Sequence, residues 1–252
     1  MHKLIRFEFR KLFRSRYFYV IAAVSILFIL FAGITYSIIK AIAGGDPGLP
    51  LTNAYSFVKG ALGNNFTILI GIFVAIAATE DNAMGTMKNI IGKGYSRLKV
   101  FLSKYLVSLV GVLIISALVV GIAFLYGTFA FEKAPIEDNL AIVIPGQLLS
   151  IIAFHSMFYA ISSGFGKIGP AIAVSIVGPM VVSLALTIAD TAIATANLPV
   201  QAKPGNYWLD GLFNNFLRAP NPIGNGACFG LLFAYLALAL LIGFLINRKK
   251  EY

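Results

Sequence analysis

Charged residues are scarce in this chain. Of 252 residues, 12% are Asp, Glu, Lys or Arg and 59% are apolar, whereas soluble domains carry about 25% charged residues. A water-soluble fold could not hide so much apolar surface, so a soluble enzyme is excluded. Uncharged stretches recur along the whole sequence, which predicts a single all-α integral membrane domain over residues 1–252 with no separate catalytic domain.

Thiols and deeply placed charges are also nearly absent. The single cysteine, Cys228, excludes an internal disulfide and a metal site built from several thiolates. Deep in the apolar runs, His155 is the only His, acidic or basic residue. Ion-coupled carriers usually need intramembrane carboxylates, and intramembrane proteases need convergent His, acidic or Ser groups. A secondary carrier and an intramembrane enzyme therefore stay as weaker alternatives, and we predict an interhelical hydrogen bond for His155, with no catalytic residue and no metal site.

A nucleotide-binding loop is missing as well. Gly92-Lys93-Gly94 and Gly166-Lys167-Ile168 lack the Ser or Thr and the glycine spacing of a Walker motif. We therefore expect this chain to bind no cofactor of its own.

Six apolar runs, uncharged apart from Lys104 near the start of the third, are long enough to cross a membrane, which takes about 20 helical residues. The first run is 18–39, and the second begins between Gly60 and Phe66 and ends at Thr79. The third is 100–129, and the fourth lies within 141–163. The fifth is 169–189 and the sixth is 227–246. Pro145 is expected in the first turn of the fourth helix, where its missing amide costs nothing.

The net charge of +10 is a topology signal rather than a nucleic-acid signal, because the basic residues flank apolar runs. Fifteen of the twenty lie on the side of both chain ends, and the positive-inside rule puts that side of a multi-pass membrane protein in the cytoplasm. The five on the other side are Lys40, Lys59, Lys133, Lys203 and Arg218.

The first sixteen residues form an amphipathic pattern. On a helical wheel Leu4, Ile5, Phe9, Leu12 and Phe13 share one half. The opposite half holds Arg6, Arg10, Lys11 and Arg14. This predicts an interfacial helix whose cations face lipid phosphates or water. Glu8 intrudes on the apolar half, and we expect it to pair with Lys11; a contact with a partner subunit is the alternative.

Residues 80–99 form a polar loop between the second and third spans. Its stretch Thr86 to Ile91 can make a short helix that ends at Gly92 and Gly94. Apolar Met87, Ile90 and Ile91 beside Lys88 and Asn89 would suit docking into a cytosolic partner. A solvated loop that carries only topology charge is the alternative.

Residues 190–226 are too apolar for an idle loop. Trp208, Leu209, Leu212, Phe213 and Phe216 recur at helical spacing, which predicts a short interfacial or re-entrant helix, with Trp208 at headgroup level. Anchoring and gating roles both remain open. Tyr55, Val58 and Leu62 indicate a weaker counterpart near the first outer loop.

Two segments resemble permease subunits of ABC-2 type (type V) transporters. Phe7 to Arg16 is similar to the connecting helix of that family. Glu80 through Ile91, followed by Tyr95-Ser96-Arg97 and Lys104, is similar to the acidic turn, the coupling helix and the segment before the third span. The resemblance marks two sets of residues. The coupling set is Glu80, Asp81, Gly85, Thr86, Met87, Lys88, Asn89, Ile90, Ile91, Tyr95 and Arg97, and the connecting set is Glu8, Arg10, Lys11, Leu12 and Arg14.

The resemblance implies a homodimeric permease with two copies of a separate ABC ATPase, which binds the ATP and Mg. It also implies a re-entrant gate that includes Trp208, Leu212, Phe213 and Phe216. Small members of the family resemble exporters of lantibiotics or phenol-soluble modulins, so the expected substrate is an amphipathic antimicrobial or toxin peptide. Membrane lipid is the other expected partner, and nucleic acid is not one. Export of ions, drugs or lipids, and a substrate-capture subunit of another ABC class, are the alternatives.

Overall fold

The computed structural model describes residues 2–42, 54–131, 140–218 and 221–249, and every regular element in these ranges is a helix. Six helices are long and apolar enough to cross a membrane. They are α2 (Arg16–Ile42), α4 (Asn64–Ala83), α6 (Arg97–Ala130), α7 (Leu140–Ser163), α8 (Ile168–Thr195) and α10 (Asn225–Lys249). The predicted class and the six spans are confirmed.

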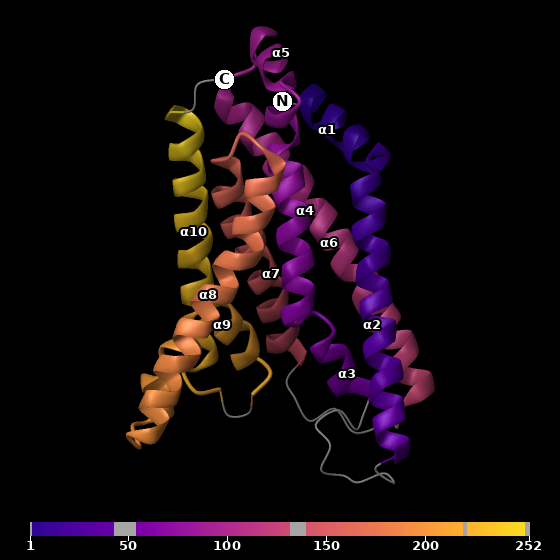
Figure 1. Cartoon of the computed structure of the whole chain (residues 1–252), viewed down its shortest axis with the longest axis vertical. Coiled ribbons are helices and arrows are strands. Elements are labelled where there is room, and N and C mark those ends of the chain that lie inside the picture. Colours follow the sequence, from indigo (N-terminus) through magenta and orange to yellow (C-terminus); the bar gives the residue numbers. More distant parts are fainter. Residues whose placement is uncertain (1, 43–53, 132–139, 219–220, 250–252) are drawn as a thin grey trace.

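Four short helices lie between or before the spans. They are α1 (His2–Arg14), α3 (Ala54–Gly60), α5 (Thr86–Gly92) and α9 (Leu209–Asn215), the last preceded by the 3₁₀ turns Val200–Ala202 and Pro204–Tyr207. Figure 1 shows α1 and α5 at one end of the molecule and α3 and α9 at the other. The sequence predicted all four positions, because each combines helical apolar spacing with polar or glycine boundaries.

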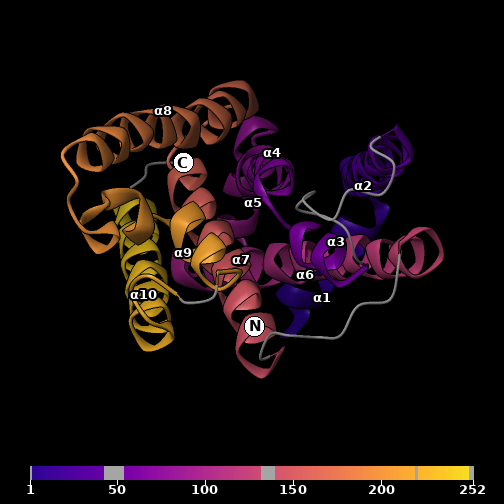
Figure 2. The ribbon, with the colours of Figure 1, turned by 90° about the horizontal axis from the view of Figure 1, so that it is seen from below.

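The six long helices differ greatly in how much of them the protein itself covers. In α7, 61% of the span is buried, whereas in α8 only 11% is. Viewed along the molecule in Figure 2, α7 lies in the middle, α6 runs from there to one margin, and α2, α8 and α10 lie at the margins. The helix α7 packs against α4 and α10, and α2 packs against α6. The marginal helices therefore turn apolar surface outward, as lipid-facing helices do.

Close approaches between helices depend on small residues. A side chain at Gly111 of α6 would meet the ring of Phe73 from α4 at 2.7 Å. One at Gly146 of α7 would meet the ring of Phe216, just after α9, at 2.6 Å. These distances are shorter than real carbon contacts, so glycine at both positions lets aromatic rings from neighbouring helices fill the space.

Two expectations about the inner helices have opposite outcomes. The ring atom Nε2 of His155 lies 2.9 Å from Ser108 Oγ, so His155 bridges α7 and α6 as predicted. The placement of Pro145 in the first helical turn was wrong. Because α7 begins at Leu140, Pro145 is its sixth residue and interrupts the backbone hydrogen-bond ladder.

Candidate functional site

A single carboxylate joins four helices at the end that carries α1 and α5. Asp81, near the end of α4, is 4% exposed. Its Oδ1 accepts hydrogen bonds from Lys11 Nζ of α1 at 2.6 Å and from Thr86 Oγ1 of α5 at 2.8 Å. Its Oδ2 accepts from Lys104 Nζ of α6. Together with Glu80, these residues form what we call the Asp81 cluster: Lys11, Glu80, Asp81, Thr86 and Lys104.

The cluster balances its charges internally. Lys11 Nζ also lies 2.9 Å from Glu80 Oε2, so two ammonium groups face two carboxylates. Burial alone would lower the pKa of Lys11, but the hydrogen bonds and negative charge of Asp81, and then of Glu80, outweigh it and raise that pKa. Lys11 therefore stays charged, and its ion pairs hold α1 against α4.

Glu8 is a second buried carboxyl beside this cluster, and it has a different environment. It is 6% exposed, and its Oε1 has no hydrogen-bond partner within the described residues. The expected pairing with Lys11 was wrong, because Lys11 turns toward the stronger acceptors on α4. Burial raises the pKa of Glu8, and the charge of Lys104 only partly opposes this.

Two glycines shape the ends of α5. Gly85 has φ +68° and Gly94 has φ +86°, which are left-handed conformations that side chains disfavour. Gly85 reverses the chain between α4 and α5, so Thr86 can reach back to Asp81 from the first residue of α5. Gly94 ends the segment as predicted, whereas Gly92 belongs to the helix itself.

The two faces of α5 have different roles. Met87 is 6% exposed and packs with Leu4 of α1 and Val100 of α6. Ile90 and Ile91 are partly buried against the same residues. Lys88 and Asn89 are exposed.

This corrects the expectation that Met87 faces a partner: its side chain attaches α5 to the rest of the chain. The exposed residues left for docking include Lys88, Asn89 and Met84, the last of which is 64% exposed.

The remaining residues of this end lie around the cluster rather than in it. Leu12 is buried, while Arg10 and Arg14 are exposed on the far side of α1. Tyr95 packs beside Met87. Arg97 donates a hydrogen bond of 3.0 Å to the backbone carbonyl of Arg248, near the end of α10, and so ties the start of α6 to the sixth span.

The predicted gate residues lie at the opposite end. Leu212, Phe213 and Phe216 are buried in the main core, where α9 packs back against α7 and α10. Trp208 is partly buried and makes an edge contact with the ring of Tyr235.

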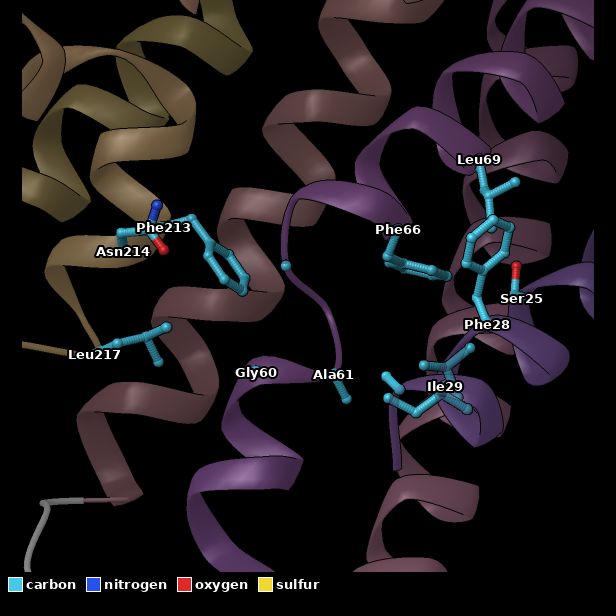
Figure 3. Close-up of a pocket in the computed structure, with 13 residues that line it drawn as sticks. Ser25, Phe28, Ile29, Gly60, Ala61, Phe66, Leu69, Phe213, Asn214 and Leu217 are labelled. Atoms are coloured by element: carbon cyan, nitrogen blue, oxygen red, sulfur yellow. The ribbon is translucent and has the colours of Figure 1, made fainter. Parts of the chain in front are cut away.

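A cavity of about 320 Å³ lies between α2, the α3–α4 turn and α9. Figure 3 shows Phe213, Asn214 and Leu217 on one side of it and Phe28, Ile29 and Phe66 on the other. Of the predicted gate residues, Phe213 lines this cavity. Its wall is largely apolar and aromatic, with Ser25 and Asn214 as polar side chains.

Sequence reasoning left Lys104 out of the coupling set, although it is the most deeply buried cation of the Asp81 cluster. A lysine a few residues inside a predicted span was the available signal, because a buried charge requires a partner. Within the described residues, no group of His, Cys, Asp and Glu is arranged to hold a metal ion.

Comparison with protein families shows that residues 4–190 match the model described as "ABC-2 family transporter protein". That range contains the whole Asp81 cluster, α5 and the first four spans, with all of α1 from Leu4 on and α8 as far as Asp190. No curated protein matches the chain.

Proposed function

Because this chain belongs to the ABC-2 transporter family and is a multi-pass membrane protein, we propose that it is the permease subunit of an ATP-driven exporter. The family implies association with an ABC ATPase, and we place the docking surface on α5, where Lys88 and Asn89 are exposed. In this proposal both chain ends lie in the cytoplasm, and the membrane is the bacterial inner membrane.

The observation that carries the proposal is the Asp81 cluster. A force applied to α5 acts on Asp81 through Thr86, and Asp81 is bonded to α1 through Lys11 and to α6 through Lys104. Met87 adds an apolar contact with α1 and α6. Displacement of α5 would therefore move two other helices together, which suits a switch between two packing arrangements.

For the substrate, we propose an amphipathic peptide and a permease homodimer. The cavity of about 320 Å³ is mostly apolar and lies beside exposed faces of marginal helices, which would suit an apolar or amphipathic molecule better than a bare ion. The exposed apolar surface of α2 and α8 would also suit contact with a second copy. Drugs and lipids are also apolar or amphipathic, so the same cavity would suit them. The liposome experiment below distinguishes them from a peptide.

Docking is tested by co-purification with a stand-alone ABC ATPase, which we would seek in a gene next to the one for this chain. We expect Lys88→Glu combined with Asn89→Asp to reduce co-purification at least tenfold, because both residues are exposed and neither contributes to the Asp81 cluster. Lys93→Glu, the same substitution as at Lys88 on an exposed residue after α5, is the matched control. Undiminished association of the double variant, or labelling of Lys88 from outside the cell, would rule out this docking surface.

The substrate is tested with the reconstituted complex in liposomes. Stimulation of ATP hydrolysis by amphipathic peptides supports peptide export. Stimulation by sodium ions without peptide would instead favour ion export, and stimulation only by a particular lipid would favour lipid export.

A further inference from the structure

A second hollow lies at the end opposite α5, between α8 and the segment that precedes α10. Its volume is about 290 Å³. Four charged residues line it: Asp190 of α8, Lys203, Asp210 of α9, and Arg218. It shares one residue, Asn214, with the cavity of Figure 3. Because it holds two carboxylates and two cations, its formal charge is balanced.

The charges in this hollow are not paired with one another. Asp190 Oδ1 accepts a hydrogen bond of 3.0 Å from the backbone amide of Gly205. Asp210 Oδ2 accepts one of 3.2 Å from Ser183 Oγ. Each carboxylate thus has a neutral donor, and no ion pair joins these four side chains among the described residues. Asp190, Lys203 and Asp210 are partly buried, and Arg218 is exposed. A ligand that brings both signs would give each of these charges a direct partner.

The indole of Trp208 adds a hydrogen-bond donor to the same lining. Burial raises the pKa of Asp210, and hydrogen bonds from Ser183 and Trp208 partly oppose this. An indole N–H usually finds an acceptor when buried, and the carboxylate of Asp210 lies close enough to act as one.

The position of the hollow along α8 indicates where such a ligand would come from. At 1.5 Å per residue, Ser183 lies about 22 Å and Asp190 about 33 Å from the start of α8 at Ile168. A hydrocarbon core of about 30 Å that begins near Ile168 ends between these two residues. The hollow therefore lies at headgroup depth, and Trp208 is of the residue type enriched there.

The outer face of α8 offers a place for acyl chains next to the hollow. Met180, Leu184 and Ile188 follow one another at helical spacing and are between 57% and 65% exposed. Thr187, between the last two, lines the hollow. A lipid whose chains lie along α8 could therefore place its headgroup in the hollow without leaving the bilayer.

We propose that this hollow binds a phospholipid headgroup that joins a primary ammonium to a phosphate, as in phosphatidylethanolamine. The ammonium donates hydrogen bonds to Asp190 and Asp210, which are acceptors only when ionised, and the phosphate accepts from Arg218 and Lys203. An anionic headgroup such as phosphatidylglycerol leaves both carboxylates uncompensated. A choline headgroup carries the charge but has no N–H donor.

The test uses the tryptophan itself, because Trp208 is the single tryptophan of the chain. The purified full-length protein in mixed micelles is titrated with lipids that carry brominated acyl chains, which quench nearby indole fluorescence. We expect the ethanolamine lipid to quench at about tenfold lower mole fraction than the choline or glycerol lipid. Asp210→Asn and Arg218→Gln should each remove this preference, and Lys93→Gln, which lies at the opposite end, should retain it.

Asp210 and Arg218 lie in different parts of the lining, so a folding defect in one variant still leaves the other as a test. The fold of each variant is checked by its elution as a single species in size-exclusion chromatography. Soluble glycerophosphoethanolamine separates the two sources of the headgroup. Competition by it means that the headgroup alone is sufficient, and its failure to compete means that the site takes intact lipid. Equal quenching by all three lipids, stronger quenching by the glycerol lipid, or a preference retained in both variants overturns the proposal. None of these results depends on transport or on the ATPase.

Discussion

Removing the carboxylate of Asp81 while keeping its shape tests the central cluster directly. The variant Asp81→Asn leaves Lys104 with an amide in place of its carboxylate partner. The side chain of Lys104 is 3% exposed, whereas that of Lys11 is 23% exposed and keeps Glu80 at 2.9 Å. The cost therefore falls mainly on Lys104. Loss of one partner from a buried pair costs about 3–5 kcal/mol, so we expect a decrease of that size in the free energy of unfolding.

A double-mutant cycle separates this cost from general damage. Lys104→Met removes the stranded ammonium, so Asp81→Asn with Lys104→Met should be more stable than Asp81→Asn alone by about 2 kcal/mol. The assay is an SDS titration of the purified protein in mixed micelles. Lys88→Met, at an exposed position of α5, is the control and should change the free energy by no more than about 0.5 kcal/mol. Additive effects of the two cluster substitutions would refute the buried ion pair.

Three further outcomes follow from the same structure. Burial raises the pKa of Glu8, so the folded protein keeps a proton that the unfolded chain releases. The stability of the fold therefore falls as the pH rises from 4.5 through the folded pKa. Glu8→Gln should reduce this pH dependence of the melting temperature, measured by thermal unfolding between pH 4.5 and 8. Gly146→Ala forces a carbon against Phe216 and should cost about 1–3 kcal/mol in the SDS titration, while Gly121→Ala, which meets nothing within 4 Å, should be neutral. Thr86→Val removes a hydrogen bond to the Asp81 cluster and should lower peptide-stimulated ATP hydrolysis of the complex while basal hydrolysis stays unchanged.

The long helices could be predicted from the sequence because the bilayer fixes their length. The run 100–129 became α6, Arg97–Ala130, since a helix continues past the hydrocarbon until capping groups end it; here Ser96 caps the start by accepting from the amide of Lys99. The short helices α1 and α5 were also predicted, because polar residues and glycines mark their boundaries. Local chemistry was sufficient for these features.

The directions of individual side chains could not be predicted in the same way. A helical wheel assigns Lys11 to the polar face, yet Lys11 turns inward because Asp81, seventy residues away in the sequence, supplies the counter-charge. Met87 resembles a docking residue until Leu4 and Val100 are known to cover it. Both errors have the same cause: polarity predicts exposure only when no distant partner is available.

The helix α6 is long enough to connect the two ends of the molecule without a break. At 1.5 Å per residue its 34 residues extend about 51 Å. Lys104 fastens it near one end, and α3 packs on it elsewhere along its course. By the same geometry, a rotation of about 10° around its midpoint would displace each tip by about 4 Å, in opposite directions. Val119, which lines the cavity of Figure 3, is part of α6. A small tilt of α6 near Lys104 would therefore change the width of that cavity directly, with no flexible linker between the two sites.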